Sequence, residues 1–151
     1  MFHDAHDVIF VASYAVVAPA WLLLMLAPGH RVTDVVNRSA MASLVVAILY
    51  LVLTLVHIGD AEGSFWSLDG VTQLFAHRHV VLIGWIHYLC FDLFVGGWIA
   101  RDARRIRVPH WLVLPCLFFT LMLGPIGLLM YFGIRVGRTA RWLIASEADR
   151  G

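Results

Sequence analysis

The stretch Gly84–Gly97, GWIHYLCFDLFVGG, is apolar enough to lie in a membrane and yet carries ionisable side chains. His87, Tyr88 and Asp92 fall within about two turns of the helix that this stretch predicts. Ionisable residues inside membrane segments are rare and mark candidate functional sites by default. The rest of the chain is therefore interpreted as the setting of these three residues.

The whole chain shares this apolar character. Of its 151 residues 61% are hydrophobic, and the mean hydropathy is +0.82, whereas about 45–50% is usual for soluble domains. Charged residues lie between the apolar runs, with Asp92 as the exception. We therefore expect an integral, multi-pass membrane protein. The net charge of +1 gives no broad basic field, so nucleic acid is not expected as a partner.

The apolar runs predict an all-α membrane protein with four transmembrane helices in a single domain over residues 1–151. A helix needs about 20 apolar residues to cross about 30 Å of hydrocarbon. The expected spans cover residues 8–27, 40–57, 80–100 and 111–134. Ser67 is a helix-capping residue followed by an amphipathic run, which predicts a short interfacial helix between the second and third spans.

The fourth expected span is interrupted near its middle. Pro125 has no N–H to bond the Leu121 carbonyl, and Gly124 and Gly127 allow another backbone to come close. A kink or break at mid-membrane depth is expected, and such breaks occur where the backbone is buried against protein. We expect this segment to complete the site on the third span.

Four spans would place both termini on one side of the membrane. The expected connections then carry six arginines on one side and five on the other, so the positive-inside rule does not set the orientation. The flanks of the first span, acidic before it and basic after it, favour termini outside.

The third span has one polar face. Residues four apart lie about 40° apart around a helix, so Tyr88 and Asp92 share a face with Trp85. His87 lies about 140° from Asp92, so these two could border one pocket only with another helix between them. A carboxylate at mid-bilayer costs about 2.5–3.5 kcal/mol. Asp92 is therefore expected to be either hydrogen-bonded or kept neutral as an acid.

Three interpretations of this cluster stay open. In the structural one, Asp92 accepts a hydrogen bond from Tyr88, Thr54 or Thr120. In the catalytic one, the cluster performs general acid and base chemistry on an apolar substrate that enters from the lipid.

The third interpretation is a metal site, since imidazole and carboxylate groups are metal ligands. Its candidate ligands are His57, His87, Asp92 and His110. No HxxxH or HExxH pair lies on any expected helix. No cofactor is expected from the pattern.

Four segments resemble the abscisic-acid-deficient-four-like (ABA4-like) membrane proteins, a neoxanthin-synthase-like family. They are Ser67–Gly70, Gly84–Gly96, Pro109 and Leu121–Leu129. The resemblance covers about Ser67–Tyr131, while the first two spans match only in hydropathy and position. Plant members of this family are needed for neoxanthin formation in chloroplasts. Because the chain carries no transit peptide, a prokaryotic inner membrane is expected instead.

The resemblance implies a carotenoid or related isoprenoid as a lipid-soluble substrate, and an isomerase as the activity. Turning an epoxy end group into an allene requires protonation of the epoxide oxygen and removal of a proton from the neighbouring polyene carbon, without redox change. Asp92 or Tyr88 would supply the proton, and His87 would accept one. The residues expected to line the substrate pocket are Trp85, Phe91, Thr120, Gly124 and Pro125.

A second class of function is non-catalytic. The chain would then bind pigment or lipid, or serve as a small subunit of a larger membrane complex or a homo-oligomer. A copurified coloured ligand would favour a polyene binder in either class, and only a chemical change in that ligand separates the two.

Overall fold

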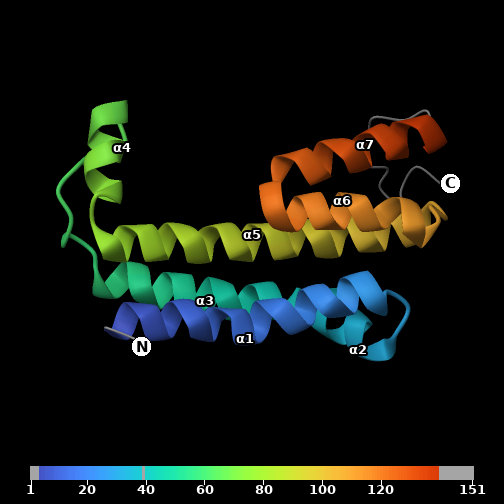
Figure 1. The fold of residues 1–151 in the computed structure, drawn as a ribbon, viewed down its shortest axis with the longest axis horizontal. Coiled ribbons are helices and arrows are strands. Elements are labelled where there is room, and N and C mark those ends of the chain that lie inside the picture. The colour runs from blue at the N-terminus through green and yellow to red at the C-terminus, as the bar shows by residue number, and fades with distance from the viewer. Residues whose placement is uncertain (1–3, 39, 140–151) are drawn as a thin grey trace, which may run out of the picture.

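The computed structural model describes residues 4–38 and 40–139, and every regular element in these ranges is a helix (Figure 1). The elements are α1 (Ala5–Leu26), α2 (Arg31–Thr33), the π-helical turn η1 (Asp34–Arg38), α3 (Met41–Val56), α4 (Leu68–Phe75), α5 (Arg78–Arg105), α6 (His110–Leu123) and α7 (Pro125–Thr139). The predicted all-α class is confirmed for this part of the chain. The predicted domain over residues 1–151 extends beyond it.

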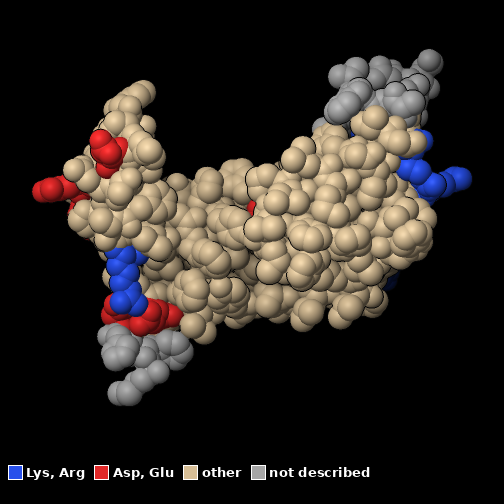
Figure 2. Space-filling view, turned by 45° about the horizontal axis from the view of Figure 1, so that its top comes forward, with Lys and Arg blue, Asp and Glu red and all other residues tan. Residues whose placement is uncertain are grey.

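Within the described part of the chain, three segments are long and apolar enough to cross a membrane. They are Ala5–Leu26, Arg31–Val56 and Arg78–Arg105. In Figure 1, α1 and α3 lie along α5, which runs the length of the molecule. On the face that Figure 2 shows, charged side chains gather at the two ends, and the middle is almost uncharged. This distribution is the one expected of a protein surrounded by hydrocarbon.

Helix α1 approaches α5 closely at Gly96. A Cβ atom at this position would stand 2.5 Å from the Trp21 ring, so only glycine leaves room for that side chain. Trp21 is 2% exposed and belongs to the buried core together with Leu24 and Leu93. The missing side chain at Gly96 therefore sets the spacing of the two helices.

The predicted short helix is present as α4. The Ser67 hydroxyl accepts a hydrogen bond from the Gly70 N–H at 3.0 Å, which caps the helix as expected. Helix α4 projects away from the beginning of α5 (Figure 1), and Phe75 packs over Gly84. Its position at a membrane surface stays a prediction.

The break predicted near Gly124 and Pro125 is present, but the structure corrects the single crossing that was predicted over residues 111–134. Helix α6 ends at Leu123, Gly124 has a φ of +36°, and α7 begins at Pro125 and runs back along α6 (Figure 1). Helix α6 has 14 residues and is therefore about 21 Å long, too short to cross about 30 Å of hydrocarbon. The two helices form a hairpin, and Figure 1 shows it beside the C-terminal half of α5 only.

Candidate functional site

The carboxyl group of Asp92 faces the turn of this hairpin. Asp92 lies in the middle of α5 and is 8% exposed. A Cβ atom at Gly124 would stand 2.8 Å from Asp92 Oδ1, so the carboxyl group packs directly against the backbone where the chain reverses. This is the contact expected from the interruption in the sequence.

Tyr88 lies one turn before Asp92 and also contacts the hairpin. Its hydroxyl donates a hydrogen bond to the Leu121 carbonyl at 3.0 Å. This is the carbonyl that Pro125, lacking an N–H, leaves without a helical partner. The same hydroxyl is close to the Asp92 carboxyl group, but its hydrogen is directed to Leu121. Tyr88 therefore holds the end of α6 in place.

One oxygen of Asp92 has no hydrogen-bond partner. Asp92 Oδ2 is buried and unpaired among the described residues. The other two expected donors are engaged elsewhere, since Thr54 donates to the Tyr50 carbonyl at 2.8 Å and Thr120 donates to the Cys116 carbonyl at 2.7 Å. The donors Thr54 and Thr120 of the structural interpretation are therefore not used, while Tyr88 stays close to the Asp92 carboxyl group.

A second buried aspartate on α5, Asp102, differs from Asp92 because both of its carboxyl oxygens have hydrogen-bond partners. Asp102 is 5% exposed, and its Oδ2 accepts from the Tyr131 hydroxyl at 2.7 Å and from Arg135 Nε at 2.9 Å. Its Oδ1 accepts from Arg105 Nη2 at 2.7 Å. The bonds from Tyr131 and Arg135 tie α7 to α5. They were not predicted from the sequence, although Tyr131 and Arg135 lie four residues apart and so share a face of α7.

His87 and Phe91 lie on another face of α5. The exposed His87 ring packs against Tyr50 of α3 with 5.4 Å between centroids and against Phe91 with 4.7 Å between centroids. Phe91 is 56% exposed. The structure therefore does not bring these two predicted residues to the Asp92 carboxyl group.

Of the remaining predicted residues, Trp85 lies near α1, and Thr120 and Pro125 belong to the hairpin. The Trp85 ring lies 5.5 Å from the Tyr88 ring and 5.7 Å from that of Phe10 on α1, between centroids. Thr120 is fully buried inside the hairpin, where a Cβ atom at Gly127 would stand 2.1 Å from its backbone nitrogen. Pro125 is exposed on the hairpin turn.

A hollow lies between α4 and the hairpin (Figure 2). Gly84, Tyr88 and Asp92 are spaced four residues apart and so lie along one side of the helix. Phe75 of α4 covers Gly84 at one end of this row, and Gly124 covers Asp92 at the other. The row is about 12 Å long at 1.5 Å per residue. Figure 2 shows the surface stepping down between the part built by α4 and the part built by the hairpin.

The predicted metal set is not assembled. His57 stacks on His79 at the end of α3 with 4.8 Å between centroids, while His110 Nε2 contacts the Met25 carbonyl at 2.8 Å at the far end of the molecule. The four candidates His57, His87, Asp92 and His110 are therefore spread along the bundle. Within residues 4–38 and 40–139 no group of three or more ligating side chains is placed to hold a metal ion.

Comparison with known proteins agrees with the resemblance in the sequence. The family model described as ABA DEFICIENT 4-like matches residues 8–131. The "Protein ABA DEFICIENT 4, chloroplastic" of Arabidopsis thaliana is 25% identical over 134 residues, which cover 82% of this chain. The chain spans 59% of the length of that relative. No solved structure matches the chain.

Proposed function

Because the chain belongs to the ABA DEFICIENT 4-like family, we propose that it binds a carotenoid or related isoprenoid in the membrane and isomerises it, with Asp92 as the acid. The observation that carries this proposal is the buried, unpartnered Oδ2 of Asp92 beside the hairpin turn.

An aspartate in this position favours its neutral form. A charged carboxylate at mid-bilayer costs about 2.5–3.5 kcal/mol, and that cost persists unless a partner compensates it. Asp102 has such partners in Tyr131 and Arg135, whereas no ion pair of Asp92 is formed among residues 4–38 and 40–139. We therefore assign a proton to Asp92, and this proton is available to a ligand.

The surroundings of Asp92 suit a long apolar ligand. Tyr88 lies on α5 between Gly84, which Phe75 covers, and Asp92, which Gly124 covers. Ile126 on the hairpin is 47% exposed, and Phe75 is 48% exposed, so both ends of the hollow present apolar side chains. A polyene could enter sideways from the lipid and place a polar end group at Asp92.

One carboxyl group can perform the whole isomerisation of an epoxide to an allene. One oxygen of Asp92 gives its proton to the epoxide oxygen as the C–O bond breaks. The other oxygen accepts the proton of the neighbouring polyene carbon, and the electron pair of that C–H bond forms the new double bond. The acid is regenerated without redox change. His87, on another face of α5, is not needed, and its role as a base stays a prediction.

The test uses the full chain in membranes that contain an epoxy-carotenoid. Wild type is compared with Asp92→Asn and with Asp69→Asn, a matched control that changes an exposed carboxylate on α4. Wild type and the control should form an isomer of unchanged mass and altered absorption. Asp92→Asn should still bind pigment but convert it about 100-fold more slowly or worse, since general acid catalysis contributes about 10²–10⁴.

Two results would change this proposal. Pigment that copurifies with the wild type but stays chemically unchanged would favour the non-catalytic pigment or lipid binder. Full conversion by folded Asp92→Asn would remove this residue from the mechanism.

We propose that three helices cross the membrane and that the α6–α7 hairpin enters it without crossing. Irregular backbone is tolerated at that depth only where protein or water covers it, and the turn at Gly124 is covered by Asp92 and Tyr88. The printed name of the relative places that protein in a chloroplast. A prokaryotic inner membrane, a homo-oligomer and a larger complex stay predictions for this chain.

A further inference from the structure

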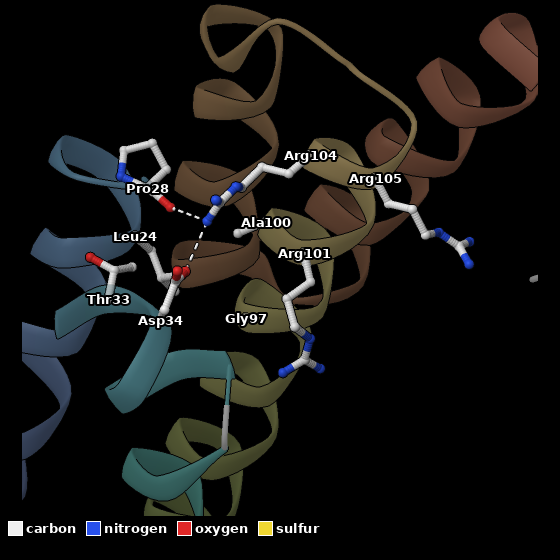
Figure 3. A pocket seen from close by; sticks show the side chains of 9 residues that line it. All are labelled: Leu24, Pro28, Thr33, Asp34, Gly97, Ala100, Arg101, Arg104 and Arg105. Atoms are coloured by element: carbon white, nitrogen blue, oxygen red, sulfur yellow. Dashed lines mark hydrogen bonds and ion pairs between the residues drawn. The ribbon is translucent and has the colours of Figure 1, made fainter. Parts of the chain in front are cut away.

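A cavity of about 460 Å³ opens at the end of the bundle where α5 finishes (Figure 3). Its walls come from the end of α1, from α2 and η1, and from the last turns of α5. It lies beyond Gly97, whereas Asp92 faces the hairpin, so it is separate from the site above.

Arg104 is held in a fixed orientation at this cavity. Its Nη1 donates to the Pro28 carbonyl at 2.8 Å and to Asp34 Oδ1 at 2.8 Å, as the dashed lines in Figure 3 show. Both bonds use one nitrogen, so Nη2 and Nε keep their hydrogens for a ligand. A guanidinium group fixed in this way suits the oxygens of a phosphate group.

The charged lining is mainly cationic. Arg101 and Arg105 also line the cavity, but the guanidinium group of Arg105 points away from those of Arg101 and Arg104 (Figure 3). Among the described lining residues Asp34 is the one carboxylate. Arg105 is paired with Asp102. The excess of arginines favours an anionic ligand over a neutral or cationic one.

The deeper wall is apolar. Leu24, Gly97 and Ala100 line the cavity on the side of the membrane centre. Gly97 precedes Arg101 by one turn, about 6 Å along α5. A ligand with an anionic headgroup and an apolar chain could contact both the arginines and the apolar wall. Free phosphate would leave the apolar wall without a contact.

We propose that this cavity binds an anionic phospholipid, with the headgroup phosphate at Arg101 and Arg104 and an acyl chain along Leu24 and Gly97. Basic pockets between membrane helices are recognised sites for such headgroups. The lipid would bridge α1, η1 and α5 on the side opposite the hairpin turn.

The test uses the purified full chain in an uncharged detergent, with bound lipid measured by native mass spectrometry. The probes are phosphatidylglycerol, phosphatidylcholine and inorganic phosphate. Wild type should prefer phosphatidylglycerol, and Arg101→Gln should reduce that preference about fivefold. Arg101→Lys should keep most of it, because the charge remains.

The matched control is Arg138→Gln. Arg138 lies at the same end of the molecule but outside the cavity, where it donates to the Arg107 carbonyl at 2.8 Å. The control should keep the full preference. An equal loss in both glutamine variants, or no loss in Arg101→Gln, would overturn the site. Displacement of phosphatidylglycerol by inorganic phosphate would overturn the assignment to a lipid.

Discussion

Two aspartates on α5 are buried to a similar degree and differ in their partners. Asp102 accepts hydrogen bonds from three side chains, whereas Asp92 leaves one oxygen unpaired. A buried ion pair is costly to break because its surviving charge loses its partner, and a neutral buried acid has no such partner to lose. The first aspartate therefore maintains the fold, and the second is the one to which we assign a role with a ligand.

This contrast predicts that replacing each aspartate by asparagine changes the stability of the protein by different amounts. Asp102→Asn removes the carboxylate that pairs with Arg135 Nε, a side chain 2% exposed, and should destabilise the protein by about 3–5 kcal/mol. Asp92→Asn should change stability by less than about 1 kcal/mol, because an amide of the same shape replaces a neutral acid. Thermal unfolding in detergent measures both. A larger loss for Asp92→Asn than for Asp102→Asn would contradict the assignment.

Removal of the Tyr88 hydroxyl should also be measurable. Tyr88→Phe leaves the Leu121 carbonyl without its donor and should cost about 1–3 kcal/mol. Tyr14→Phe is the control, since Tyr14 is 36% exposed and its ring only packs against Phe10. Equal unfolding temperatures for the two variants would show that the bond to Leu121 is not formed.

At the residue scale the sequence predicted the contacts that follow from local rules. Pro125 identified the Leu121 carbonyl as unpaired, and the interruption at Gly124 indicated the segment that meets Asp92. The bonds of Asp102 were not predicted, because a crossing over residues 111–134 would place Arg135 on the opposite side of the membrane from Asp102.

At the scale of elements, the hairpin depends on close backbone contact. A Cβ atom at Gly127 would stand 2.3 Å from the Cys116 carbonyl oxygen, and backbone atoms cannot move aside as a flexible side chain can. Hydropathy does not distinguish a helix that crosses the membrane from a hairpin of two shorter helices. The apolar run at residues 111–134 was therefore predicted as one crossing. The helical stretches on either side of Gly124 are each too short to cross, and this length was the signal available in the sequence.

Replacing each of two glycines of α7 by alanine should therefore change the stability of the protein in opposite directions. Gly127→Ala should destabilise the protein by about 1–3 kcal/mol or more, since overpacking forces α6 and α7 apart. Gly133→Ala meets nothing within 4 Å and should stabilise it by about 0.5–1 kcal/mol through helix propensity. The unfolding temperatures of the two variants measure this difference. A similar change in both variants would argue against the hairpin.

At the scale of the molecule, the hairpin changes the distribution of arginines. Because α7 turns back, its arginines join those at the end of α5, as Arg138 shows by its bond to the Arg107 carbonyl. In the described ranges this end carries Arg31, Arg38, Arg101, Arg104, Arg105, Arg107, Arg135 and Arg138. The opposite end carries Arg78, which is paired with Asp4 and Asp7.

The positive-inside rule then predicts the arginine-rich end on the cytoplasmic side. Single cysteines test this in a background where Cys90 and Cys116 are alanine. A membrane-impermeant thiol reagent should label Glu62→Cys in intact cells and Arg31→Cys only after permeabilisation, since both positions are exposed at opposite ends. The reverse pattern would place the arginines outside.

The measurement that tests the role of Asp92 most directly is the infrared difference spectrum of the full chain on addition of an epoxy-carotenoid. A neutral carboxyl group that meets the ligand should give a C=O band that shifts on binding and is absent from Asp92→Asn. Asp102→Asn, if it folds, should keep this band. An identical difference spectrum for wild type and folded Asp92→Asn would show that the ligand does not meet this carboxyl group, and would contradict the proposed site.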